Sequence, residues 1–450
     1  MNVAAMFAEQ FSAELMQPGG ELHDFEVADV VGEELLKELL KGGRRFLERP
    51  SFLTQAQIAA YQRDLATCAD LLVSLPDRRY GGSAVAMAEA LGLPAPSIEL
   101  IRAAEGLPRP RYGRVDAMLS ERGLRVLEFN ATSETGGLEW IAPAIRAWLD
   151  QPAAAKFLAD RQCEYVPPTT VLADELRAFA AAHVGSDDPT VVIVEGAGGM
   201  ARYGHAWRPL RELLSEEGLQ VLVCELPELS VRNGRAFVGE QAVDVVYRVF
   251  ELSQVTDDAA STAILLDLIR LAHDGAVAIW TSIDSELFRN KACMATLHSP
   301  ELDRTEQETA AVRRLLPPTT LIAAAPTEAE LGDLIRRREE LILKPTDGFA
   351  GAGIVAGWEV PQARWEAAIR ALTGPAVVQQ RVLPLAEDVR GRDGQVRQLE
   401  SVYGFYYSPG LAYAGGGSRP HAYGSSYITD GTNAPTAELS PVFIIKEDST

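Results

Sequence analysis

The sequence predicts an α/β, or α+β, protein, and three patterns support this prediction. Apolar strands alternate with helices along residues 190–281, which is typical of a parallel sheet covered on both faces. Two runs of alternating residues, 113–119 and 124–130, flank a short turn and predict a β-hairpin. The last third of the chain is rich in strands that are interrupted by glycine and proline.

Composition excludes two broad classes of partner. The 450 residues are enough for roughly two to four domain-sized units, and a hydrophobic fraction of 47% is that of a globular protein. A net charge of −21 leaves no basic excess to neutralise a phosphate backbone, so we expect no nucleic-acid partner. No stretch reaches the ~18 apolar residues that a membrane helix needs, so we expect no membrane partner.

The start of the chain and its cysteines predict a cytoplasmic protein. Residues 1–22 have acids in place of a basic flank and lack a continuous apolar core, unlike a secretory signal. The four cysteines, Cys68, Cys163, Cys224 and Cys293, include no CxxC pair. This spacing favours reduced thiols over a disulfide framework or a zinc site.

Residues 1–110 are predicted to form an N-terminal helical segment. Apolar residues recur at three- and four-residue spacing along 30–47 and 55–75, and Pro50 and Pro76 end these two helices. The segment carries no residues that suggest chemistry. We therefore expect a scaffold that forms part of a substrate cleft.

The predicted hairpin carries the candidate metal site. Asp116 and Glu128 can lie close together on one face of its strands, and Asn130 points to that face because strand side chains alternate. Two carboxylates and a carboxamide form an oxygen-rich site of the kind that Mg²⁺ prefers. The alternative is a solvated hairpin with incidental acids. We favour the metal site because acids among apolar residues are normally paired or ligating when buried.

The segments after the hairpin are predicted to include ligand-facing loops. Residues 131–137 form a Ser/Thr/Gly loop before an apolar helix, which suits an N-cap or a contact to a substrate carboxylate or phosphate. Its position after the metal ligands favours the contact. Residues 166–285 are predicted to be a Rossmann-like subdomain without a dinucleotide, since the glycines at 196–199 do not complete a GxGxxG motif. For Arg248, at a strand end, a structural ion pair is the favoured interpretation.

Two lysines lie beside elements that suit a polyphosphate. Lys291 starts an amphipathic helix, and Lys344 ends an apolar strand before a glycine-rich turn. Such a turn brings backbone amides and an ammonium group to phosphates, although no GKS or GKT follows to make it a P-loop. The alternative is an ordinary glycine-rich hairpin with a surface lysine. A lysine seldom flanks a buried strand without a partner, so we favour the phosphate contact.

These pieces together resemble the ATP-grasp ligases. Lys291 and Lys344 sit where that fold has two nucleotide-binding lysines. The glycine-rich turn looks like its phosphate-covering loop, and residues 377–380 look like its adenine hinge. The resemblance implies ATP and Mg²⁺ as cofactors. The implied nucleotide contacts are Lys291, Lys344, Gly348, Gly351, Gly353, Gln379 and Gln380.

The order of the motifs resembles one branch of that family. In most ATP-grasp ligases the metal ligands follow the lysines, whereas here they precede them. This order resembles the circularly permuted branch represented by the synthetase domain of glutathionylspermidine synthase. Its arginine and three magnesium ligands are matched in type and spacing by Arg114, Asp116, Glu128 and Asn130. Two features depart from that branch. Residues 1–110 are too few and too helical for its N-terminal cysteine amidase domain, so we expect none there, and the glycine-rich loop carries fewer charges.

The resemblance implies roles and a division of the chain. Arg114 and Arg419 are implied to orient a carboxylate and stabilise an acyl phosphate, with a structural ion pair as the alternative for Arg419. The loop near Phe349 is expected to close over the site. The expected units are the helical segment 1–110, the metal-ligand hairpin and helix 111–165, the Rossmann-like subdomain 166–285, the ATP-binding subdomain 286–400 and the C-terminal strands 401–450.

The predicted function is that of an ATP- and Mg²⁺-dependent carboxylate–amine ligase. It would form an amide through an acyl phosphate, with an amino acid or a short peptide as substrate. Two alternatives stay open: a phosphotransferase of the same fold acting on a non-amine acceptor, and a non-catalytic nucleotide-binding scaffold. A dehydrogenase ranks last because the dinucleotide motif is incomplete. The expected partners are small-molecule carboxylate and amine substrates, and the sequence leaves open whether a homodimer forms.

Overall fold

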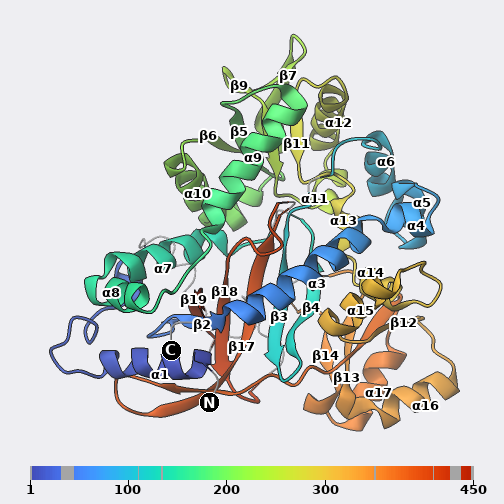
Figure 1. The fold of residues 1–450 in the computed structure, drawn as a ribbon. Helices are drawn as coiled ribbons and strands as arrows, with labels where there is room; N and C mark the ends of the chain where they lie inside the picture. The colour runs from blue at the N-terminus through green and yellow to red at the C-terminus, as the bar shows by residue number, and fades with distance from the viewer. Residues whose placement is uncertain are drawn as a thin grey trace.

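A long mixed sheet runs through the middle of the protein (Figure 1). The structure is a computed structural model that describes residues 3–31, 45–109, 111–132, 135–348, 351–408, 410–425 and 437–446. The strands of the long sheet follow the order β1 (Arg45–Phe46), β19 (Glu438–Ile445), β18 (Gly416–Ala422), β17 (Val396–Tyr407), β3 (Gly113–Ser120) and β4 (Gly123–Asn130). Two shorter strands join it, β2 (Ser51–Thr54) beside β19 and β16 (Glu387–Arg390) beside β17.

The predicted hairpin is confirmed. Strands β3 and β4 pair in antiparallel register, and Asp116 lies directly opposite Glu128. The register shifts between Asp116 and Ala117, which leaves Leu127 as an extra residue in β4. Such a bulge changes the direction of nearby side chains and leaves the extra residue without a partner in the ladder.

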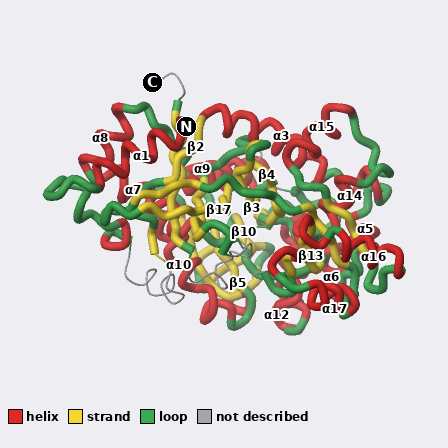
Figure 2. Tube along the Cα trace, turned by 90° about the horizontal axis from the view of Figure 1, so that it is seen from below, coloured by secondary structure: helices red, strands yellow, loops and turns green. Residues whose placement is uncertain are grey.

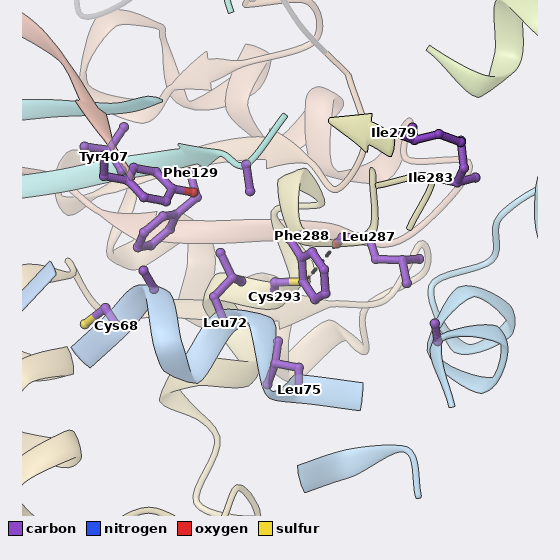
Figure 3. Close-up of a cluster of buried hydrophobic side chains, with 14 of the residues drawn as sticks. Cys68, Leu72, Leu75, Phe129, Ile279, Ile283, Leu287, Phe288, Cys293 and Tyr407 are labelled. Atoms are coloured by element: carbon purple, nitrogen blue, oxygen red, sulfur yellow. Dashed lines mark hydrogen bonds between the residues drawn. The ribbon is translucent and has the colours of Figure 1, made fainter. Parts of the chain in front are cut away.

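The alternation of β4 decides which of its residues face the core. Phe129 is 3% exposed and belongs to a large apolar cluster with Leu72 of α3 (Gln55–Val73) and Leu287 of α13 (Ser285–Arg289). Figure 3 shows its ring packed beside Tyr407, with Leu72 and Leu75 below. A shift of one residue would expose this ring, so its burial holds Glu128 and Asn130 on the opposite face.

The segment 1–110, which was predicted to be helical, also contains two short strands. The helices α1 (Val3–Leu15), α3, α4 (Leu75–Arg79), α5 (Ala84–Ala90) and α6 (Ala95–Ala103) are present. Strands β1 and β2 lie between α1 and α3, and both pair in parallel with β19. The helix predicted along 30–47 falls mostly outside the described residues, and its end is β1. Strands this short show no period of their own, and their partner lies near the other end of the chain.

A second, four-stranded sheet is wholly parallel. Its order is β11 (Ala278–Trp280), β10 (Val245–Arg248), β5 (Thr190–Glu195) and β6 (Gln220–Glu225). The helices of this region are α9 (Pro168–Val184), α10 (Gly199–Glu216), α11 (Leu252–Thr256) and α12 (Ala259–His273). A small antiparallel sheet of β7 (Leu229–Arg232), β8 (Arg235–Val238) and β9 (Gln241–Val243) follows β6. The parallel sheet that was predicted for residues 190–281 is therefore present.

A third sheet carries the glycine-rich turn. Its antiparallel order is β12 (Thr319–Ile322), β15 (Ala376–Gln380), β13 (Leu341–Pro345) and β14 (Val355–Ala356), with the turn between β13 and β14. The helices of this region are α14 (Ala292–His298), α15 (Glu306–Leu315), α16 (Glu328–Arg336) and α17 (Gln362–Arg370). The strand, turn and returning strand predicted around Lys344 are confirmed.

Two groups of helices lie at opposite ends of the long sheet. Both views place α1, α7 (Leu138–Asp150) and α8 (Pro152–Asp160) at one end and α14 to α17 at the other (Figures 1 and 2). All four cysteines are free thiols, and three of them are buried. Among the described helices, none has the length and apolarity that a membrane crossing requires.

Candidate active site

A cavity of about 650 Å³ lies where the long sheet meets the parallel sheet and α10. Its lining includes residues of β3 and β4 from the long sheet, Glu195 from β5, and residues of α7 and α10. The predicted residues that it brings together are Arg114, Asp116, Glu128, Asn130, Lys291, Gly348, Gly351 and Arg419. Strands β3 and β18 lie on either side of β17, which explains how Asp116 and Arg419 meet although they are far apart in sequence.

Asp116 is held between two arginines. Arg114 Nε donates to one of its carboxylate oxygens at 3.0 Å, and Arg419 Nη2 donates to the other at 2.7 Å. Burial alone would raise the pKa of Asp116, but the two guanidinium groups outweigh it and hold that pKa well below its usual range. The ion pair considered for Arg419 is therefore present. It also fixes the directions of both guanidinium groups at the cavity wall.

Glu128 and Asn130 offer further oxygen atoms to the same wall. Lys291 Nζ lies 3.7 Å from Glu128 Oε2, and the side chain of Glu128 is 26% exposed. Asn130 Nδ2 is buried and has no hydrogen-bond partner among the described residues. The described residues therefore leave the NH2 group of this carboxamide, a hydrogen-bond donor, unsatisfied at the cavity.

The three side chains fit a Mg²⁺ ion in chemical type. No described group of three or more His, Cys, Asp or Glu residues makes a metal site by itself, so the carboxamide of Asn130 is needed to complete the set. Each carboxylate oxygen of Asp116 has a second lone pair beyond the one that an arginine uses. Asp116, Glu128 and Asn130 could therefore hold a hard cation with oxygen ligands.

The bulge in β4 connects the acidic wall to Lys344. The carbonyl of Leu127 accepts hydrogen bonds from Lys344 Nζ and Gln379 Nε2, both at 3.2 Å, and Lys344 also donates to Gln379 Oε1 at 2.8 Å. Burial and the nearby Lys291 lower the pKa of Lys344 to about 8, although Glu128 opposes them. Lys344 and Gln379 are buried and do not line the cavity. Lys344 is nevertheless bonded to the residue that precedes Glu128.

The glycine-rich turn lies at the edge of the cavity. Gly348 and Gly351 line it, and the carbonyl of Gly348 accepts a hydrogen bond from Lys291 Nζ at 3.0 Å. Gly353 has a φ of +72°, and a Cβ there would lie 2.8 Å from Pro345 Cγ, so a larger residue would not fit. Gly353 and Gln380 are not among the lining residues. Phe349, where loop closure was expected, lies outside the described residues.

The loop at 196–199 does not offer its amides to a dinucleotide. The Gly196 N–H donates to Glu195, and the Gly198 and Met200 N–H groups donate to Glu225. Protein carboxylates therefore occupy the positions where a phosphate would bind at this helix start. Arg248 is fully buried and contacts Glu286 at 3.5 Å, which agrees with the ion pair favoured from the sequence.

Several cavity residues were not predicted from the sequence. Arg289 approaches Glu251 at 3.1 Å and Asp347 of the glycine-rich turn at 3.7 Å, and thus links the parallel-sheet side to the turn. Its position two residues before Lys291 was a usable signal. The other missed lining residues include Glu139, Glu195, Arg202, Tyr203, His205, Trp207 and Glu251. Glu195 ends a parallel strand, which is where ligand sites of α/β sheets gather.

Comparison with known proteins supports the fold. No protein-family model and no curated protein matches the chain. A solved structure of a glutathione synthetase-like effector from Globodera pallida, in its apo form, aligns over 97% of this chain and 99% of its own, with 13% identity and a TM-score of 0.57. A putative gamma-glutamylcysteine synthetase from Methylobacillus flagellatus KT aligns over 87% and 89%, with 13% identity and a TM-score of 0.40. The chain therefore shares the overall α/β fold of the glutathione synthetase-like effector.

Proposed function

We propose that this protein is an ATP- and Mg²⁺-dependent carboxylate–amine ligase with ATP-grasp elements in permuted order. The observation that carries the proposal is the meeting of Glu128 with both predicted lysines: Lys291 lies 3.7 Å from it, and Lys344 bonds to the adjacent carbonyl of Leu127. The likeness in fold to a glutathione synthetase-like effector agrees with this reaction class. A cavity of about 650 Å³ has the size of a small-molecule site, which suits a ligase that joins small substrates.

The charges around the cavity suit a metal–triphosphate complex better than a bare metal ion. We call Asp116, Glu128 and Asn130 the metal-type trio. Its two carboxylates already face three cationic side chains, those of Arg114, Arg419 and Lys291, and these would repel an isolated Mg²⁺ ion. A triphosphate would bring the negative charge that balances both the cations and the metal. We therefore assign Asp116, Glu128 and Asn130 to the metal and Lys291 to the phosphates. Lys344 would join Lys291 at the phosphates by exchanging its bond to the Leu127 carbonyl for a phosphate oxygen, since it lies behind the cavity lining. Bound Mg²⁺ would neutralise charge on the transferred phosphoryl group.

The reaction would proceed in two steps. An oxygen of the substrate carboxylate attacks the γ-phosphorus, the bond to the β-bridging oxygen breaks, and ADP leaves. The amine nitrogen then attacks the carbonyl carbon of the acyl phosphate, phosphate leaves, and the nitrogen loses a proton. Arg114 and Arg419 would orient the carboxylate and stabilise the negative charge that builds up on it, because Asp116 fixes both guanidinium groups. The glycine-rich turn beside Lys291 would keep water from the acyl phosphate.

A trapping assay tests this proposal. The protein is incubated with ATP, Mg²⁺, pooled amino acids and hydroxylamine, and both ADP and hydroxamate are measured. Formation of both supports an acyl phosphate, because hydroxylamine intercepts it. ADP without hydroxamate would favour the phosphotransferase alternative. Neither product with any amino-acid pool would favour the nucleotide-binding scaffold.

A further inference from the structure

Glu195 is a buried acid of the parallel sheet that lines the same cavity as Asp116, Glu128 and Asn130. It ends β5, lines the cavity and is 1% exposed. Two hydrogen bonds fix its carboxylate: the Gly196 N–H donates to Oε1 at 2.8 Å, and the Trp207 indole N–H donates to Oε2 at 2.8 Å. The side chain is therefore held in one orientation by neutral donors.

No described lysine, arginine or histidine forms an ion pair with Glu195. The charged groups that act most strongly on it are two further acids, Glu225 and Glu251, and burial raises its pKa in the same direction. Burying a carboxylate without a cation is costly, and neutral hydrogen bonds offset only part of that cost. A cationic ligand beside Glu195 would therefore favour its ionised form and remove part of this cost.

The backbone leaves space for this side chain. A Cβ on Gly199 would lie 2.2 Å from Glu195 Cγ, so the first residue of α10 has to be glycine for Glu195 to take this position. Trp207 and Tyr203 of α10, with Trp140 of α7, add aromatic surface to the same cavity. Aromatic faces stabilise cations, and an acid beside them is a combination that suits an ammonium group on an apolar chain.

We propose that Glu195 binds an ammonium group of the amine substrate and so determines which amines the enzyme accepts. This rests on the proposed ligase function. The orientation fixed by Trp207 makes Glu195 a specificity residue for the amine, separate from the trio that handles the phosphates.

A substitution combined with two acceptors tests the assignment. n-Butylamine has one nitrogen, which must lose a proton before it can attack, so it cannot be held as an ammonium ion while it reacts. 1,4-Diaminobutane can present one ammonium group to Glu195 while its other nitrogen attacks as the neutral amine. Glu195→Gln should raise the KM for diaminobutane at least about tenfold, the effect of losing a hydrogen bond to a charged group, and raise the KM for butylamine much less. Glu212→Gln removes the same charge from an exposed position of α10 and should change neither KM. A diaminobutane KM unchanged in Glu195→Gln, or an equal rise in the KM for butylamine, would overturn the assignment.

A binding experiment separates this inference from the ligase proposal. Saturation-transfer NMR with butylammonium and, as its neutral counterpart, 1-butanol needs no turnover. Wild-type protein should bind butylammonium at least about tenfold more tightly than Glu195→Gln does, with no difference for butanol. Equal affinities for butylammonium would refute the inference even if hydroxamate forms. A selective loss in Glu195→Gln without any hydroxamate in wild type would support the ammonium site and count against the ligase.

Discussion

Two acids of one cavity, Asp116 on the long sheet and Glu195 on the parallel sheet, have different partners. Asp116 has two arginines, and its neighbour on the long sheet, Glu128, has Lys291 within 4 Å. Glu195 has only neutral hydrogen-bond donors among the described residues. Acids whose charge is balanced by the protein suit a ligand that carries both a metal and phosphates, and an acid without a cation suits a ligand that brings one. This contrast is the basis on which we propose that the nucleotide binds at the long sheet and the amine at Glu195.

The largest effect is expected from Glu128 on the long sheet. Glu128→Gln keeps the shape of the side chain and removes its charge, so ADP formation should fall at least about 10²-fold, as when one preorganised electrostatic group is lost. Because Glu128 is partly exposed, the melting temperature should stay close to that of wild type. Glu121→Gln, in the turn of the same hairpin, is the matched control and should keep full activity. A Glu128→Gln rate near that of wild type would remove the metal assignment.

The Asp116–Arg419 ion pair tests whether the opposite charges on the long sheet stabilise each other. Arg419→Met leaves Asp116 with one arginine and should destabilise the fold by about 2 kcal/mol, since a largely buried charge loses a partner. Asp116→Asn alone should also destabilise it, but the double variant should lose less than the sum of the two. Chemical denaturation of all four proteins gives the coupling energy. Additive losses would show that the pair is not an energetic unit.

Lys344 should make nucleotide affinity depend on pH. Its pKa is lowered to about 8, so the ammonium that would bind phosphate is lost as pH rises through that value. The affinity for a non-hydrolysable ATP analogue should therefore fall several-fold from below pH 8 to above it, by calorimetry. Lys344→Met should bind more weakly and lack this step. A step of unchanged size in Lys344→Met would assign the titration to another group.

The smallest effect that we expect is on how the stability of the protein depends on pH through Glu195. Burial raises the pKa of Glu195 in the folded protein, so the fold disfavours its ionised form. The penalty is absent below the unfolded pKa, near ~4.3, and grows as pH rises above it. Glu195→Gln removes this penalty, and its melting temperature relative to wild type should rise from acid to neutral pH. A relative melting temperature that falls over that range would show that the carboxylate stabilises the fold.

The part of the candidate site on the long sheet could be predicted from the sequence because short-range residue patterns determine it. The alternation of β4 places Phe129 in the core and Glu128 and Asn130 in the cavity, and both sets are readable from a period of two. The strand, glycine turn and strand around Lys344 were likewise readable. In both cases the residues that set the geometry lie within a few positions of each other.

The features that were missed depend on distant contacts. Strand β1 has only two residues, and it pairs with β19, which lies near the other end of the chain. The bulge at Leu127 is visible only in the register of the two strands, and it decides where Lys344 bonds. Glu195 ends a strand like many acids do. Three features distinguish Glu195 from such acids: its burial, its hydrogen bond with Trp207, and its close packing against Gly199, where a Cβ would clash with it.

The transfer of oxygen from substrate to phosphate tests carboxylate activation most directly. Amino acids labelled with oxygen-18 in the carboxylate are incubated with the protein, ATP, Mg²⁺ and hydroxylamine, and the released phosphate is analysed by phosphorus NMR. An acyl phosphate requires one labelled oxygen to pass from each activated carboxylate to the phosphate, and we expect that label. Phosphate released together with ADP but free of oxygen-18 would contradict the account.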